Sequence, residues 1–268
     1  MRCALYAACV MLWIPAALCL SPWPLEGVVT TARQDAAKVT LVQQSNLTRA
    51  SYLPVIAGVA RALAAFQAAN GSIIDPYEHV EIQYSTPCFA FAAATVATTG
   101  VAPELLEPAM LALDSALFQL GGDPRSPHCA SGHSNFFTFP SVRAFELLKP
   151  HASAARLANW TLWLNQLNPN GYATRTGNWG LVAVAGEFER LVLNGFGNAT
   201  QAEWWTSVLD AQMRVGAFTA SGNYLDHSGM AGLNPLPYDT FPDKYMAVLI
   251  RSGYNTTSKL PGAPFPWA

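Results

Sequence analysis

The strongest constraint on the fold is a repeated alternation along the chain. Apolar segments of helical length alternate with short loops rich in Gly, Pro and Asn. In segment 52–69, apolar residues recur at i, i+3, i+4 and i+7, the spacing of a helix with one buried stripe. Asn70 and Gly71 end this segment, and Pro54 falls in its first turn, where proline is tolerated. Further helices are expected at 87–99, 103–120, 141–148, 153–166, 179–193, 201–215 and 242–251.

Alanine is frequent inside these segments, and the apolar–polar alternation of β-strands is scarce. Alanine favours helix and permits close approach of neighbouring helices. The succession of helix, short loop and helix therefore predicts an all-α protein of stacked helical hairpins. These hairpins would form either an open solenoid or a partial or complete (α/α) toroid.

The first residues have the pattern of a secretory signal peptide. Arg2 provides a positive charge, and residues 4–18 form an apolar run that is too short to span a bilayer. Small residues near position 19 suit signal peptidase. We therefore expect a removed signal at 1–19, a single domain at 20–268 and a secreted protein.

Two covalent modifications are expected in the mature chain. Several N-x-S/T sequons behind a signal peptide indicate a surface-glycosylated protein. The sequons begin at Asn46, Asn70, Asn159, Asn198 and Asn255. Removal of the signal leaves Cys88 and Cys129, which form a disulfide bond in an oxidising compartment if their Cα atoms are close enough. Two separate buried thiols are the alternative.

Charge and hydropathy exclude several kinds of partner. The formal net charge is -2 and Lys and Arg do not cluster, which argues against nucleic acid. No segment after the signal has about 18 uninterrupted apolar residues, so we expect no membrane span. We expect a monomer.

No metal or other cofactor is predicted. His128, Cys129 and His133 are close in sequence, but no second cluster has zinc-finger spacing and H-E-x-x-H is missing. Glu78 and Glu81 flank His79 and could share a hard ion, although such groups are commonly solvated. The G-x-S-x-G nucleophile motif is also missing.

Three loops, 71–87, 121–139 and 222–242, contain His, aromatic, Asn or acidic residues in place of plain connector residues. In a ring of helical hairpins, loops on one rim converge on a cleft, and functional groups tend to lie on such loops. Within the first two loops, Gln83, Tyr84, His133 and Asn135 offer polar and aromatic contacts to a sugar. Packing by Phe136 and Phe137 is the structural alternative for the second loop.

Asn178 stands where a Gly-bearing loop meets a helical segment, followed by Trp179. One interpretation is a helix N-cap above a buried aromatic residue. The other uses the uncharged amide to take up negative charge that develops on a carboxylate. In the third loop, His227 and Tyr238 are suited to removing and returning a proton beside one carbon, or to a structural role in a Pro-rich turn.

Two short motifs resemble a known catalytic segment: TGNW, which ends at Trp179, and YLDHS, which follows later around His227. The segment is that of the (α/α)-toroid polysaccharide lyases of the hyaluronate and chondroitin AC lyase type. Related alginate and glucuronan lyases have similar residues. The resemblance implies that Asn178 neutralises a uronate carboxylate, that His227 takes or relays the C5 proton, and that Tyr238 is base, acid or both. Trp179 would be a stacking platform. Tyr224 and Tyr245 are alternatives to Tyr238, because the spacer after His227 is longer than usual in that family.

We therefore expect a lyase that cleaves an anionic, uronate-containing polysaccharide by β-elimination. Arg125, Arg143 and Arg175 are candidates to pair with substrate carboxylates. The first alternative is a glycoside hydrolase on the same scaffold, which needs two facing carboxylates. Its candidate carboxylates are Glu78, Glu187, Asp226, Asp239 and Asp243. The second alternative is a non-catalytic carbohydrate-binding glycoprotein.

Overall fold

The computed structural model describes residues 48–82, 84–122, 136–167, 178–214, 244–245 and 247–249. Within these ranges 76% of the residues are helical and no strand forms, which confirms the all-α prediction. The α-helices are α2 (Arg49–Ala64), α3 (Ser85–Thr98), α4 (Leu106–Leu117), α5 (Thr138–Leu148), α6 (Ala154–Gln166), α7 (Asn178–Glu187) and α8 (Ala199–Arg214). The shorter elements are 3₁₀ turns η2 (Pro103–Leu105) and η5 (Lys149–His151), and π-helical turns η3 (Phe118–Gly122) and η6 (Phe188–Leu193).

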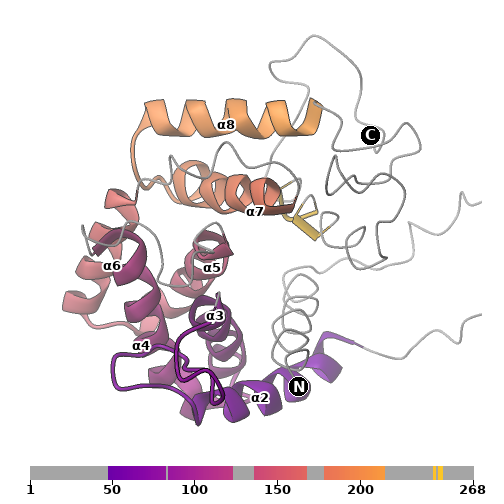
Figure 1. Cartoon of the computed structure of the whole chain (residues 1–268), viewed down its shortest axis with the longest axis vertical. Helices are drawn as coiled ribbons and strands as arrows, with labels where there is room; N and C mark the ends of the chain where they lie inside the picture. The colour runs from indigo at the N-terminus through magenta and orange to yellow at the C-terminus, as the bar shows by residue number, and fades with distance from the viewer. Residues whose placement is uncertain are drawn as a thin grey trace, which may run out of the picture.

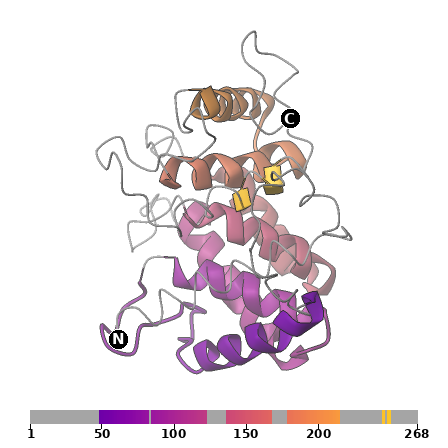
Figure 2. The same ribbon diagram turned by 90° about the vertical axis from the view of Figure 1, so that its right-hand side faces the viewer.

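Helices α3, α5 and α7 form a buried column, in which α3 packs against α5 and α5 packs against α7. Figures 1 and 2 show this column continuing to α8 at one end and to α2 at the other, with α4 and α6 beside it. Every residue of α3 from Ser85 to Ala97 is buried, whereas α6 buries only Trp160 and Leu164. The most apolar segments therefore occupy the inside, and the amphipathic segments cover them.

The end of α2 differs from the sequence prediction. The helix stops at Ala64, and a bridge pairs Gln67 with Ile73. The Gln67 amide donates to the carbonyl oxygens of Gly71 and Pro108, at 3.1 and 2.8 Å. These contacts replace the last helical turn that the apolar pattern predicted.

The start of α2 also differs. Because the helix begins at Arg49, Pro54 lies inside it and not in its first turn, so the prediction for Pro54 was wrong. A proline at this position removes one backbone donor from the helix.

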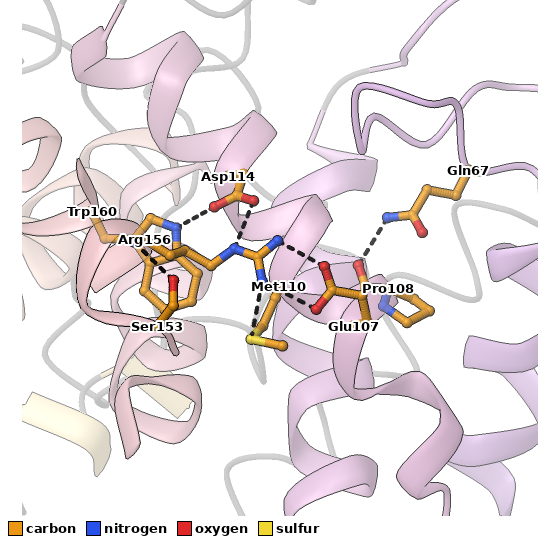
Figure 3. A network of polar contacts seen from close by, with 8 residues as sticks. All are labelled: Gln67, Glu107, Pro108, Met110, Asp114, Ser153, Arg156 and Trp160. Carbon is orange, nitrogen blue, oxygen red and sulfur yellow. Dashed lines mark hydrogen bonds and ion pairs between the residues drawn. The ribbon is translucent and has the colours of Figure 1, made fainter. Parts of the chain in front are cut away.

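A polar network joins the outer helices α4 and α6 (Figure 3). The Arg156 guanidinium donates to both carboxylate oxygens of Glu107, at 2.8 and 3.1 Å, and to Asp114 at 3.0 Å. The indole of the buried Trp160 donates to the other oxygen of Asp114 at 2.6 Å. Burial raises the pKa of Asp114, and Trp160 and Arg156 oppose this rise. The network therefore stabilises the packing of α4 against α6, beside the middle of the buried column.

No helix within the described ranges is both long and apolar enough to cross a membrane.

Candidate functional site

Residues at the ends of the first two loops singled out in the sequence lie in one aromatic cluster with Tyr245. Tyr84 at the end of the first loop stacks on Phe136 in the second, with ring centroids 4.7 Å apart and planes inclined by 17°. Phe139 packs edge-on against Tyr245, which lies just beyond the third loop, at 5.0 Å. We call these four side chains the aromatic junction. The ends of the first two loops are therefore close together, and the third loop, 222–242, lies outside the described residues.

Hydrogen bonds hold the first loop upstream of Tyr84. The Asp75 carboxylate accepts hydrogen bonds from the backbone N–H groups of Tyr77 and Glu78, at 2.8 and 2.9 Å. The hydroxyl of Thr86 in α3 accepts from the Ile73 N–H at 2.9 Å. These hydrogen bonds tie the loop both to itself and to α3.

Gly71 lets the same loop lie directly on α4. Its φ is +91°, and a Cβ at this position would lie 2.0 Å from the carbonyl oxygen of Leu111. Only glycine meets both requirements.

A buried ion pair lies next to the start of α5. Arg190 donates two hydrogen bonds from Nε and Nη2 to Glu187 Oε2, at 2.9 and 2.6 Å, and both side chains are almost fully buried. Arg190 also donates to the Leu164 carbonyl at 2.7 Å. Burial raises the pKa of Glu187, while Arg190 and Thr138 oppose the rise. Glu187 is fully engaged by the scaffold, which makes it a poor catalytic carboxylate for the hydrolase alternative.

A second pair, Arg143–Glu189, is only partly satisfied. Arg143 of α5 donates to Glu189 Oε1, while Glu189 Oε2 and Arg143 Nε have no hydrogen-bond partner among the described residues. Burial raises the pKa of Glu189 to about 7, against the opposing effect of Arg143. A carboxyl group that titrates near neutral pH can act in proton transfer if solvent or ligand reaches it.

The π-helical turn η6 explains why these charges face inward. Phe188, Glu189, Arg190 and Leu191 are consecutive and all buried. A π turn contains an extra residue compared with an α-helical turn and is frequent at functional sites. The register change carries Glu189 and Arg190 into the protein beside α5.

Lys244, Tyr245 and Cys88 lie near the same charges. Burial lowers the pKa of the Lys244 ammonium well below its usual range, and Cys88 opposes this shift. Burial also raises the pKa of Tyr245 well above its usual range, with smaller contributions from Cys88, Tyr84 and Glu189. Tyr245 is fully buried, so it is not poised to act as a base toward a polymer.

The described residues contain part of the predicted site. Tyr84 lies in the aromatic junction, and Phe136 and Phe137 are buried, as the structural alternative for that loop predicted. Asn178 and Trp179 are the first two residues of α7, so Asn178 opens the helix itself and is not the residue before it. The side chains of Asn178 and Trp179 lie outside the described part.

The remaining predicted site residues also lie outside the described residues. They are Gln83, His133, Asn135, Arg175, His227 and Tyr238, together with Cys129, the expected disulfide partner of the buried Cys88.

Helix α7 packs closely on the start of α5. Gly186 lies against the start of α5, where a Cβ would be 2.7 Å from the Phe139 nitrogen. Asn178 is two helical turns earlier, which is about 12 Å along the axis. Leu181 and Val182, about one turn after Asn178, pack in the same apolar cluster as Phe136 and Phe139.

Glu189, Arg190 and Lys244 were not singled out from the sequence. A signal was present, because Glu187, Glu189 and Arg190 interrupt a long apolar segment that was predicted to be a helix. Charged residues in such a segment either face solvent or pair inside the protein. The pattern alone does not distinguish these two cases.

No group of three or more His, Cys, Asp or Glu side chains in the described ranges is arranged to hold a metal ion. Comparisons with protein-family models, curated proteins and solved structures found no match.

Proposed function

We propose that this protein is a secreted polysaccharide lyase that cleaves a uronate-containing polymer by β-elimination. The observation that most supports the proposal is the stacking of Tyr84 on Phe136, because it brings together the ends of two loops that hold predicted site residues. Phe136, Phe139 and Tyr245 are buried and Tyr84 is partly exposed, so Tyr84 is the member of the junction that can offer an aromatic face to a sugar.

The helical arrangement supports an (α/α)-toroid scaffold. In such a scaffold an inner row of helices is covered by an outer row, and the packing of α3 on α5 and of α5 on α7, with α4 and α6 beside them, supports this proposal. The inner helices are more completely buried than α6 on the outside. We propose that the described helices form an arc of this double-layered ring.

We propose that a polymeric substrate uses both Asn178 and Tyr84. Neighbouring sugars of a bound polymer occupy successive subsites along a cleft. In this proposal Tyr84 belongs to one subsite, with the reacting uronate bound at Asn178. Trp179 stacks on a sugar ring, and Gln83, His133, Asn135 and Arg175 provide polar contacts.

The proposed chemistry begins with neutralisation of the uronate carboxylate. The Asn178 amide donates a hydrogen bond to it, and the N-terminus of α7 adds partial positive charge. The C5–H bond becomes more acidic, and His227 or Tyr238 removes its proton. The electron pair forms the C4=C5 bond, the bond from C4 to the glycosidic oxygen breaks, and that oxygen receives a proton from the His227–Tyr238 pair.

The test is the appearance of unsaturated uronide, which absorbs in the ultraviolet. Purified full-length protein is incubated separately with alginate, glucuronan, hyaluronan and chondroitin. We expect a rise in absorbance with at least one polymer. The variants Asn178→Ala, His227→Ala and Tyr238→Phe should each lose about 100-fold or more in kcat.

Matched controls come from residues far from the proposed chemistry. His151→Ala changes an exposed histidine in η5, and Tyr52→Phe removes a hydroxyl from α2. Both should retain the activity of the parent protein. Saturated reducing ends in the product would indicate hydrolysis instead, and polymer binding without any product would indicate a carbohydrate-binding glycoprotein.

A further inference from the structure

Three of the N-x-S/T sequons lie in the described ranges, and the structure distinguishes between them. Asn70, Asn159 and Asn198 are all exposed. N-glycosylation needs the amide nitrogen of the asparagine and the hydroxyl of the residue two positions later. The surroundings of that hydroxyl differ at the three sites.

The hydroxyl of the Asn70 sequon is enclosed by the fold. Ser72 is 4% exposed, and its hydroxyl is 2.9 Å from that of Ser115. The Asn70 side-chain oxygen accepts from the Ser72 N–H at 3.1 Å. This sequon is therefore accessible to a glycosylating enzyme only before the loop packs on α4.

The Asn159 sequon is built into α6. Its middle residue, Trp160, is fully buried and donates to Asp114. With 3.6 residues per turn, Asn159 and Thr161 point in directions about 200° apart. This sequon is also accessible only before its helix folds.

The Asn198 sequon is open in the folded protein. Asn198, Ala199 and Thr200 are all exposed. The Asn198 side-chain oxygen accepts from the Gln201 N–H at 2.9 Å, and Gln201 Oε1 accepts from the Asn198 N–H at 3.3 Å. This reciprocal capping of α8 uses the amide oxygen of Asn198. The amide nitrogen, which would carry a sugar, takes part in neither bond.

We propose that Asn198 carries an N-linked glycan on the exposed cap of α8. Transfer forms a bond between Asn198 Nδ2 and the anomeric carbon of a diphosphate-activated sugar. The bond from that carbon to the donor's phosphate oxygen breaks, the diphosphate leaves with the electron pair, and Nδ2 gives up one proton. The inference depends on entry into the secretory route and is independent of the elimination chemistry.

The experiment expresses the full chain in a eukaryotic secretory host and examines cells and medium together. Peptide N-glycosidase converts each glycosylated asparagine to aspartate, which peptide mass spectrometry detects. We expect conversion at Asn198 in nearly all molecules, and occupancy there at least equal to that at Asn70 and Asn159. An unmodified Asn198 peptide in both fractions, or lower occupancy than at the other two sequons, would overturn the proposal.

Matched variants separate glycosylation from the capping of α8. Asn198→Asp keeps an oxygen that can cap the helix but removes the acceptor amide. The variant should therefore stay folded and should run faster in gel electrophoresis than the parent, by the shift that one glycan causes. Thr200→Ala should lose the same shift, and Thr200→Ser should keep it. Persistence of the full shift in Asn198→Asp contradicts the assignment.

Discussion

Arg143 and Glu189 form an ion pair that joins α5 to the π-helical turn after α7, and only the arginine reaches solvent. The Glu189 side chain is 1% exposed and that of Arg143 is 20% exposed. Glu146 of α5 adds negative charge nearby and raises the pKa of Glu189 further. The pair therefore places a carboxyl group with a pKa of about 7 between α5 and the turn that follows α7.

Glu189 should make stability fall as pH rises toward neutrality. Its pKa is about 7 in the folded protein and its ordinary value is 4.5, so the folded state binds the proton more tightly than the unfolded state. The resulting stabilisation is complete below pH 4.5 and is lost as pH rises to about 7. At about 1.4 kcal/mol per pH unit, the upper limit of the loss is about 3 kcal/mol.

Urea denaturation of the parent protein and of Glu189→Gln at several pH values tests this effect. The stability of the parent minus that of the variant should decrease between pH 5 and pH 8, because the variant has no such titration. Other groups that titrate in both proteins cancel in this difference. A difference that stays constant or grows with pH refutes the prediction.

Arg156 should contribute more to stability than a more exposed arginine. It contacts Glu107 and Asp114 together, and its removal leaves the half-buried Asp114 with Trp160 as a donor (Figure 3). We expect Arg156→Ala to lower the free energy of unfolding by about 1 to 3 kcal/mol. Chemical denaturation measures this change.

Arg61 provides the control for Arg156. It pairs with Glu104 at 2.7 Å, but both side chains are more than half exposed. Arg61→Ala should therefore cause a smaller loss, because surface ion pairs contribute little. Equal losses for the two variants would argue against a stabilising α4–α6 network.

Gly71→Ala should destabilise the protein by at least about 2 kcal/mol, since strain and a steric clash add. Gly100 has a similar φ of +79° but open space where a Cβ would lie. Gly100→Ala should therefore cost only about 1 kcal/mol. Thermal unfolding compares the two variants, and an equal effect would show that the contact with Leu111 relaxes.

Tyr238 and Tyr245 should differ in their effect on catalysis. Tyr245 is fully buried and burial raises its pKa, so Tyr238 and Tyr224 remain as candidates for proton transfer. Tyr238→Phe should lower kcat by about 100-fold or more, whereas Tyr245→Phe should act mainly on thermal stability. A larger kcat loss in Tyr245→Phe would reassign the catalytic tyrosine.

The sequence by itself determined the helical segments. Each expected helix in the described ranges is present, because apolar spacing and alanine content act locally on the backbone. For the second loop it left two interpretations open, and the burial of Phe136 and Phe137 agrees with the structural one, since large apolar side chains tend to leave water.

Only the tertiary structure decided which polar residues are buried and which loop ends meet. After the end of α2, Gln67 donates to the Pro108 carbonyl, which lies far along the chain. Glu187 and Arg190 could each have faced water, and their burial depends on Leu164 and α5 being close. The contact of Tyr84 with Phe136 likewise joins distant segments. Such long-range contacts depend on helix packing, which no local pattern specifies.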